Sequence, residues 1–427
     1  MRKIVLSIIA IILSFSNICL ANGIVNDKNL LQPEAFLDYK NGDKLILSAE
    51  NIRFFNNNLV KKESVLYNLE EYPQKIDKQD LVNKIKSVST ILDEYNYLDG
   101  NLINDNDKKK LQDELNIDKI NDKIKYGVVL RRTNIRTVPT AKGLYESPSE
   151  IKFDYLQESV VDPSTAVIVL HVSKNNQFYY IQTTDYSGWV SAKNIALAKR
   201  EDWLKYLNPQ KFMVVTDSKK IIPFNGEMLM YQMGAKIPVV QQNGTDKLLM
   251  PYNGKQGLGN YYLNINNEIG LHKGYLAYTT NNIIKQSYKM LGDVYGWGGL
   301  DNSVDCSGFI QNIYKTVGIN LPRNADQQEN SLAINDYRNI TPKGKRDDIN
   351  KLAKGSLLFM DGHVMMYLGS INNEPYVIHS LGSYSVKQKD NSMKKIPILK
   401  VVVSDLNLQR YSGKSFLTSL TGSAEIK

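Results

Sequence analysis

The chain has 427 residues, of which 42% are hydrophobic and 23% charged, with two cysteines and a net charge of +9. This length corresponds to about two to four domains, and the composition excludes a wholly disordered chain, a collagen-like chain and a disulfide-stapled scaffold. The lysines and arginines are scattered, so we expect no nucleic-acid partner and only weak attraction to polyanions such as wall polymers.

The first residues are typical of a secretory signal. Arg2 and Lys3 precede an apolar stretch over 4–15, and small residues at Cys19 and Ala21 suit cleavage after residue 21. The stretch is shorter than the ~20 residues that span a bilayer, so a retained anchor is disfavoured. The residues before Cys19 also fit a lipidated cysteine poorly, and no later segment predicts a membrane span. We therefore expect 1–21 to be a signal peptide of an exported protein, located in the periplasm or at the cell wall.

Residues 22–125 are rich in Asn, Lys and Asp and predict a mostly helical region. Asp77 is placed to cap a helix in which four apolar residues recur at helical spacing: Leu81, Ile85, Val88 and Leu92. A second short helix is expected around Leu111 and Leu115. Neither helix carries chemically reactive side chains, so we expect both to pack on a neighbouring domain.

From residue 126 the pattern changes to short alternating runs separated by Pro, Gly, Asn and Asp, which predicts a small β-barrel over 126–204. The stretches 131–140, 171–173 and 188–190 resemble a bacterial SH3-like domain. Residues 205–279 show the same pattern of short alternating runs, so a second SH3-like barrel is expected there. His171 and His272 fall in these barrels and are interpreted as structural.

Cys306 stands at the predicted start of a helix. Asp305 suits the N-cap, Gly318 suits the C-terminal cap, and an apolar face recurs at helical spacing: Phe309, Ile310, Ile313, Tyr314 and Val317. Unpaired N–H groups at a helix start favour a thiolate, which is the nucleophilic form of cysteine. The competing interpretation is that Cys306 is a small buried core residue. Cys306 by itself does not favour one of these two interpretations over the other.

Two of the four histidines favour the catalytic interpretation. Asp361-Gly362 predicts a tight hairpin turn before a strand that begins at His363, and a turn near 370–374 leads into Ile378-His379. If residues near 369 and 374 pair, His363 lies opposite about residue 380, so the two imidazoles are neighbours. One imidazole then takes the thiol proton and the other orients it. No cysteine or histidine pair has metal-ligand spacing, so we expect neither a metal nor a cofactor.

Residues 280–427 resemble the NlpC-type family of cell-wall cysteine peptidases, which have a compact papain-like fold. The motifs that carry the resemblance are 295–299 (Tyr-Gly-Trp-Gly-Gly), 305–309 (Asp-Cys-Ser-Gly-Phe), 321–323 with Gln327, 355–359, 362–364 and 378–379. Multidomain members have an N-terminal helical region, two SH3-like domains and the peptidase. The resemblance therefore implies an α+β chain in which a papain-like catalytic domain follows two small barrels.

The resemblance also implies roles for individual residues. Cys306 would be the nucleophile, His363 the general base and His379 the third polar residue. The substrate cleft would involve Tyr295, Trp297, Asp305, Ser307 and Arg323. An acidic group of the first barrel, either Asp154 or Glu158, would contact the free amine of the terminal L-Ala. Asn324 and Ala325 depart from the family pattern, which has a small hydroxyl residue after the arginine.

Such enzymes cleave the γ-D-glutamyl–diamino-acid bond of peptidoglycan stem peptides or muropeptides through a thioester. The alternatives are an amidase that cuts the muramoyl–L-Ala bond, an acyltransferase on the same fold, and a wall-binding protein without activity. Nothing in the sequence fixes the oligomeric state, and a monomer is expected.

Overall fold

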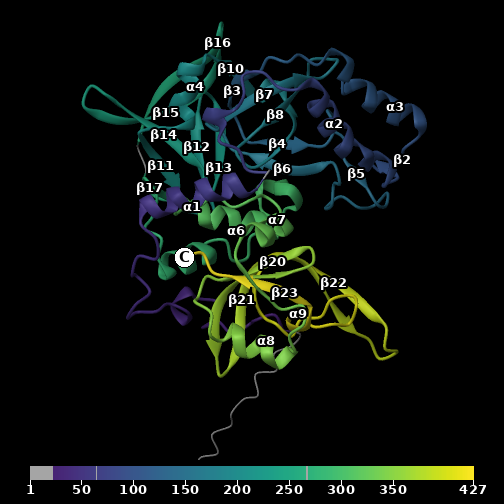
Figure 1. The fold of residues 1–427 in the computed structure, drawn as a ribbon, viewed down its shortest axis with the longest axis vertical. Helices are drawn as coiled ribbons and strands as arrows, with labels where there is room; N and C mark the ends of the chain where they lie inside the picture. Colours follow the sequence, from purple (N-terminus) through teal and green to yellow (C-terminus); the bar gives the residue numbers. More distant parts are fainter. Residues whose placement is uncertain (1–22, 64, 266–267) are drawn as a thin grey trace, which may run out of the picture.

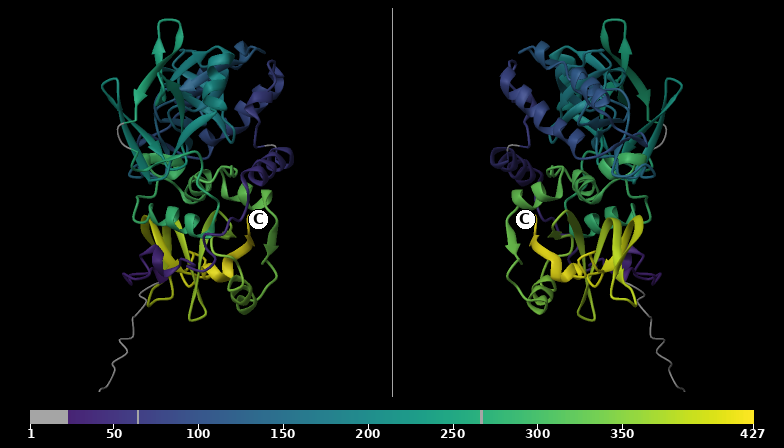
Figure 2. Two further views of the ribbon diagram at one scale, coloured as in Figure 1. Left: turned by 90° about the vertical axis from the view of Figure 1, so that its left-hand side faces the viewer. Right: turned by 90° about the vertical axis from the view of Figure 1, so that its right-hand side faces the viewer.

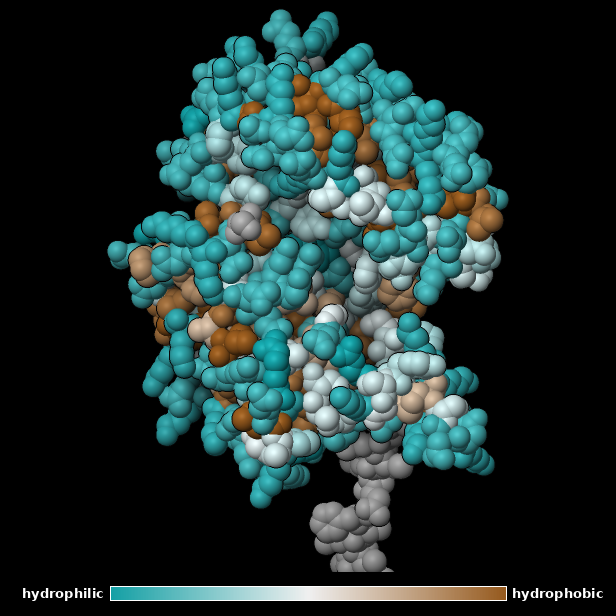
Figure 3. All heavy atoms as spheres, turned by 45° about the vertical axis from the view of Figure 1, so that its right-hand side comes forward, coloured by the Kyte–Doolittle hydropathy of each residue, from teal (hydrophilic) through white to brown (hydrophobic). Residues whose placement is uncertain are grey.

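A computed structural model describes residues 23–63, 65–265 and 268–427. The predicted signal peptide lies outside these residues. The β-rich barrels form one half of the molecule and the C-terminal mixed domain forms the other, with helix α1 (Ala49–Lys62) at the waist between them (Figures 1 and 2). In the space-filling view, hydrophobic side chains lie in separate groups on a mostly hydrophilic face (Figure 3). Among the described residues, no helix has both the length and the apolar character that a membrane span requires.

The N-terminal region divides between the two halves. Phe36, Ile52 and Leu59 belong to the apolar core of the C-terminal domain, whereas the segment that follows packs on the first barrel. That segment contains α2 (Lys78–Ser89), α3 (Asp105–Glu114) and the short strands β1 (Tyr97–Leu98) and β2 (Asn101–Leu102). Both predicted helices and their packing on neighbours are confirmed, but 22–125 is not one packing unit.

The cap predicted for α2 is present. The Asp77 carboxylate accepts a hydrogen bond from the Asp80 N–H at 3.0 Å, which satisfies one of the donors left free at a helix start. Leu81 and Ile85 are buried against the barrel, while Leu92 is buried in the 3-10 turn that follows the helix.

The first barrel is a seven-stranded antiparallel sheet in the order β10-β3-β7-β8-β9-β4-β6. Its strands are β3 (Lys125–Val129), β4 (Thr133–Arg136), β6 (Gln157–Val161), β7 (Ala166–Val172), β8 (Phe178–Gln182), β9 (Ser187–Ser191) and β10 (Ile195–Ala198). The two-residue strand β5 (Leu144–Tyr145) pairs with β1 instead. Helix α4 (Arg200–Leu207) leads from this barrel into the next unit.

The second β unit has a five-stranded sheet in the order β16-β15-β14-β11-β17 and a separate hairpin, β12-β13. These strands are β11 (Lys211–Val215), β12 (Lys219–Phe224), β13 (Glu227–Gln232), β14 (Lys236–Gln242), β15 (Thr245–Gly254), β16 (Gly257–Asn264) and β17 (Leu271–Lys273). Both sheets are consistent with small SH3-like barrels, each with its own apolar core.

The C-terminal domain is built on a six-stranded antiparallel sheet in the order β18-β23-β19-β20-β21-β22. The strands are β18 (Ile334–Asp336), β19 (Leu357–Met360), β20 (His363–Ile371), β21 (Glu374–Lys387), β22 (Met393–Asp405) and β23 (Leu420–Ala424). The helices are α5 (Thr280–Tyr288), α6 (Cys306–Lys315), α7 (Ala325–Ser331), α8 (Pro342–Ile349) and α9 (Phe416–Ser419). Helix α6 packs on β20 and β21, so the start of this helix faces the end of the sheet that carries both histidines.

Two tight hairpins set the strand order near the site. Met360 pairs with His363 across the predicted Asp361-Gly362 turn, where Gly362 has φ of +73°. The second turn is Asn372-Asn373, and both residues have positive φ, as a type I′ turn requires. The expected pairing of 369 with 374 is wrong: Gly369 pairs with Tyr376, and the register shifts between residues 367 and 369. This shift is a local irregularity of the ladder that the residue pattern does not show.

Candidate active site

Cys306 is the first residue of α6. The carboxylate of Asp305 accepts from the Gly308 N–H at 2.8 Å and so caps the helix, while the apolar face of α6 is buried in the domain core. Cys306 itself is 9% exposed and lies on the wall of a cavity. The capping residue and the apolar face together fix the thiol at the helix start, as the sequence predicts.

Burial decides the ionisation of this thiol. Loss of water raises the pKa of Cys306 to about 12, and the charge of Asp305 adds to this. The N–H groups of Val364 and Ser307 oppose the rise only in part. The helix start by itself favours a thiolate, but the desolvation of the buried sulfur favours the neutral thiol more strongly. The resting form is a neutral thiol that needs a base.

His363 and His379 are in direct contact. His363 Nε2 lies 2.7 Å from His379 Nδ1, and His379 Nε2 lies 3.0 Å from the hydroxyl of Ser404 on β22. The predicted neighbourhood of the two imidazoles is thus observed. Ser404 is fully buried and is the third member of this hydrogen-bonded series. The sequence did not predict it, because Ser404 and His379 are neighbours only through the pairing of β21 with β22.

The hydrogen bonds constrain where the protons lie. If His363 Nδ1 is to accept the thiol proton, Nε2 must carry hydrogen and donate to His379 Nδ1. His379 then carries its own proton on Nε2 and donates it to Ser404 Oγ. Ser404 therefore completes a line that leaves one basic nitrogen of His363 free.

Burial also keeps both rings uncharged. It lowers the pKa of His363 to about 4, with a further contribution from the positive charge of Arg410. Burial and the neighbouring His363 hold the pKa of His379 well below its usual range. Near neutral pH the site therefore pairs a neutral thiol with a neutral imidazole, which is able to accept a proton.

A cavity of about 510 Å³, here called the nucleophile cavity, joins these groups. It is lined by Tyr295, Cys306, Met360, Asp361, Gly362, His363, Leu381, Gly382, Ser383, Tyr384, Ser385, Lys395, Arg410, Tyr411 and Phe416. Tyr295 shares this cavity with Cys306, as expected. Burial raises the pKa of the Tyr295 hydroxyl well above its usual value, so it stays protonated and can donate a hydrogen bond.

Three predicted cleft residues form a buried network instead. Arg323 donates to both carboxylate oxygens of Asp305, at 3.0 and 2.6 Å, and to the hydroxyl of Ser307 at 3.0 Å. Its Nε also donates to Ser159 Oγ of the first barrel at 2.9 Å. Asp305, Ser307 and Arg323 do not line the nucleophile cavity. In the structure the buried guanidinium and carboxylate satisfy each other. The contact of these three residues with substrate stays a prediction.

Trp297 does not line the nucleophile cavity either. Its ring packs edge-on against Phe153 at 5.6 Å and against Tyr155 at 6.0 Å between centroids. Because both partners belong to the first barrel, Trp297 joins the barrel to the C-terminal domain.

Asp154 and Glu158, the two acidic residues expected to contact the L-Ala amine, have different surroundings in the structure. Asp154 is 4% exposed, forms an ion pair with Arg136 at 2.9 Å, and accepts from the N–H groups of Leu144 and Leu156. The hydrogen-bonding capacity of the Asp154 carboxylate is thus already used by groups of the barrel itself. Glu158 lines a second cavity of about 300 Å³ and accepts from the Tyr186 hydroxyl.

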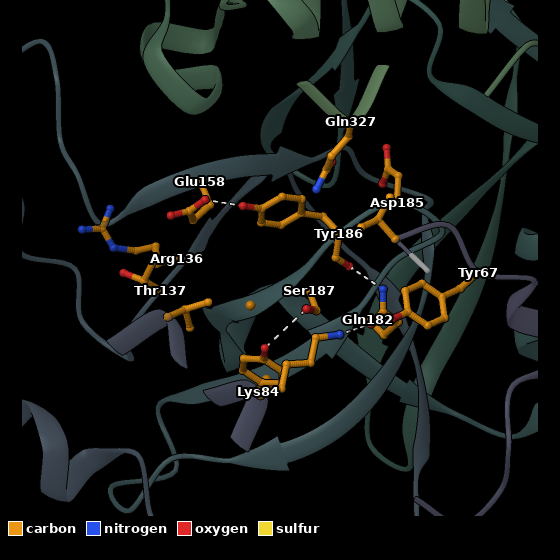
Figure 4. Close-up of a pocket in the computed structure, with 14 residues that line it drawn as sticks. Tyr67, Lys84, Arg136, Thr137, Glu158, Gln182, Asp185, Tyr186, Ser187 and Gln327 are labelled. Carbon is orange, nitrogen blue, oxygen red and sulfur yellow. Dashed lines mark hydrogen bonds between the residues drawn. The ribbon is translucent and has the colours of Figure 1, made fainter. Parts of the chain in front are cut away.

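This second cavity, here called the barrel cavity, is shown in Figure 4. Glu158 and Tyr186 lie on one side, Gln327 approaches from α7, and Lys84 approaches from α2. Burial raises the pKa of Glu158, and the bond from Tyr186 opposes that rise. Two carboxylates therefore line the cavity at the junction of the barrel and the C-terminal domain. Asp185 forms an ion pair with Lys315 at 3.4 Å, whereas Glu158 is held by the hydroxyl of Tyr186.

The remaining histidines stand apart from this site. His171 Nε2 contacts the carbonyls of Leu115 and Asn116 at 3.1 and 3.0 Å, which explains its buried place in the barrel. His272 is exposed beside the carbonyl of Gly274. Among the described residues, no group of three His, Cys, Asp or Glu side chains is placed to hold a metal ion.

Comparison with known proteins agrees with this organisation. Residues 292–403 match the NlpC/P60 family, and residues 144–191 match the SH3 domain of the SH3b1 type. A gamma-D-glutamyl-L-lysine dipeptidyl-peptidase of Bacillus cereus is 27% identical over 214 residues, which are 46% of this chain and 56% of that protein. The chain thus spans little more than half the length of this curated relative.

A solved structure has the same fold over most of the chain. An NlpC/P60 endopeptidase of Photobacterium damselae subsp. piscicida has a TM-score of 0.78 at 16% identity, covering 92% of this chain and 96% of its own. An NlpC/P60 family protein of Bacillus cereus covers 70% of this chain and 99% of its own, with a TM-score of 0.45 at 17% identity. This chain therefore carries an NlpC/P60 domain at residues 292–403 and an SH3 domain of the SH3b1 type at residues 144–191.

Proposed function

We propose that this protein is a cysteine peptidase that hydrolyses the γ-D-glutamyl–diamino-acid bond of peptidoglycan stem peptides. The observation that carries the proposal is the hydrogen-bonded line His363–His379–Ser404, whose first residue, His363, lines the same cavity as Cys306. The matched NlpC/P60 domain and the activity named for the Bacillus cereus relative support it.

The reaction proceeds through a thioester. His363 Nδ1 takes the proton of the Cys306 thiol as the sulfur attacks the γ-carbonyl carbon. Backbone N–H groups at the start of α6 stabilise the oxyanion, an interaction worth about 3–4 kcal/mol. His363 returns the proton to the leaving amine when the C–N bond breaks. Water, deprotonated by the same imidazole, then cleaves the thioester and restores the thiol.

Glu158 recognises the other end of the substrate. A free L-Ala amine is positively charged, and Glu158 supplies a carboxylate in the barrel cavity whereas Asp154 is already paired. Glu158→Gln is expected to raise KM for a peptide with a free amine but not for its N-acetylated form. An equal loss on both peptides would overturn this assignment.

The decisive test is product analysis by mass spectrometry on the synthetic tripeptide L-Ala-γ-D-Glu-diamino acid. The wild-type protein should release L-Ala-D-Glu and the free diamino acid, and Cys306→Ala should release neither while keeping the wild-type circular dichroism spectrum. Hydrolysis by folded Cys306→Ala would refute the mechanism. An amidase would instead leave the tripeptide intact and free it from muramoyl-peptides, and a wall-binding protein would bind sacculi and release nothing.

We also propose that the protein is exported. The support is the charged start at Arg2 and Lys3, the apolar stretch over 4–15 and the small residues at 19 and 21. Expression in a bacterial host should yield a mature chain beginning near residue 22. An intact N-terminus on protein recovered only from the cytoplasm would contradict export.

A further inference from the structure

The first residues that the structure describes lie against the edge of the C-terminal sheet. Strand β22 is the last strand of that sheet, and Ile24 pairs with its Ser404 in an antiparallel bridge. The Val25 N–H donates to the Val403 carbonyl at 3.0 Å. An edge strand otherwise leaves such backbone groups unpaired. Residues 23–25, here called the N-terminal strap, therefore extend the sheet beside the serine that accepts from His379.

Gly23 allows the N-terminal strap to approach β22 closely. Its φ is +78°, and a Cβ atom on it would lie 2.9 Å from Asp405 Oδ1 and 2.9 Å from Leu408 Cδ2. A side chain at this position would push the strap away from the strand, whereas glycine fits the space and tolerates the left-handed backbone. Packing of the strap thus holds Ile24 opposite Ser404.

Ile24 and Val25 face opposite sides of the sheet. Ile24 packs against the apolar cluster that contains Phe416. Val25 is buried in the other cluster of the domain, which contains Val403. Residues directly opposite each other in an antiparallel pair point to the same face, with Cβ atoms about 4.5–5.5 Å apart. The Ile24 side chain therefore lies beside the side chain of Ser404.

The apolar cluster on this face encloses the histidines. The Phe416 ring lies 6.2 Å from the His363 ring and 6.1 Å from the His379 ring between centroids. Ser404 and His379 are fully buried, whereas Ile24 is half-buried at the outer edge. The Ile24 side chain therefore lies between solvent and the hydrogen bond of His379 to Ser404. A hydrogen bond is stronger in such a water-free setting than in water.

We propose that Ile24 is a positioning residue for catalysis. Its side chain keeps water away from the Ser404 hydroxyl, so that this hydroxyl continues to accept from His379 Nε2 and holds the two imidazoles in the tautomers that the mechanism requires. The inference rests on the proposed function. Ile24 is also the third residue after the proposed cleavage site at residue 21, so cleavage deeper in the chain would remove this cover.

The experiment compares Ile24→Thr with Ile24→Val, using the synthetic tripeptide as substrate. The two new side chains have similar shape, but only threonine brings a hydroxyl next to Ser404. Ile24→Thr should lower kcat up to about tenfold with little change in KM, as expected for loss of the hydrogen bond to Ser404, and Ile24→Val should stay within about twofold of wild type. Ile24→Ala, which opens the same place to water, should show the same loss as threonine.

Val25→Thr is the matched control, because it places a hydroxyl on the opposite face of the same strap. It should lower stability in urea unfolding and leave kcat of the folded protein unchanged. In a Ser404→Ala background, Ile24→Thr should lower kcat no further, because the hydrogen bond that Ile24 protects is already absent. A residue that acts only through stability would give the same factor in both backgrounds.

Three results would overturn the inference while leaving the peptidase intact. They are an unchanged kcat in folded Ile24→Thr and Ile24→Ala, an equal fall in Ile24→Val or Val25→Thr, and a full further loss when Ile24→Thr is added to Ser404→Ala. Absence of hydrolysis by the wild-type protein would instead refute the proposed function.

Discussion

Replacing Arg323 with methionine tests the buried network that joins the first barrel to the helix that begins at Cys306. The Arg323 side chain is 6% exposed and that of Asp305 12% exposed, and the guanidinium makes two bonds to the carboxylate. In Arg323→Met the Asp305 carboxylate keeps the N–H groups of Gly308 and Gly298, at 2.8 and 3.0 Å, but loses its counter-charge. Breaking one side of such a buried pair costs about 3–5 kcal/mol.

Urea unfolding followed by circular dichroism measures this cost. Asp305→Asn keeps a side chain that can cap α6, so the double variant should be more stable than the sum of the two single losses predicts, by at least about 1 kcal/mol. Lys351→Met is the control: its pair with Asp348 is 74% and 49% exposed, and its loss should change stability by less than about 0.5 kcal/mol. A loss below about 1 kcal/mol in Arg323→Met, or purely additive losses, would refute the reasoning.

Three further predictions concern the histidine line. Ser404→Ala removes the hydroxyl that accepts the Nε2 proton of His379. Because one neutral hydrogen bond is worth about 1 kcal/mol, kcat should fall up to about tenfold with little change in KM. An unchanged kcat would contradict the tautomer assignment. The acid limb of kcat/KM should lie between pH 4 and 5 rather than near 6.5, because burial lowers the pKa of His363 to about 4. The folded state should also lose stability as pH falls from 6.5 toward 4, since the unfolded chain takes up a proton on His363 that the folded chain refuses. An acid limb centred near 6.5 would show that His363 is not desolvated.

The local elements near the site could be predicted from the sequence because neighbouring residues encode them. Asp77 and Asp305 cap their helices through bonds to N–H groups three residues ahead. The Asp361-Gly362 turn starts the strand at His363, and the next turn, at Asn372-Asn373, brings His379 back beside it. The place of Cys306 at a helix start and the contact of His363 with His379 were therefore predictable from local patterns.

The ionisation and the partners of these groups depended on tertiary structure. Burial makes the Cys306 thiol neutral, and desolvation is a property of the packed domain rather than of a helix start. Ser404 lies 25 residues from His379, and Arg323 lies 164 residues from Ser159, so no local pattern connects them. The proposed choice of Glu158 over Asp154 likewise depends on tertiary structure, because Asp154 already forms an ion pair with Arg136 inside the barrel whereas Glu158 lines a cavity. The sequence by itself determined which groups are proposed to carry the chemistry, and the packing of distant segments decided their charge and orientation.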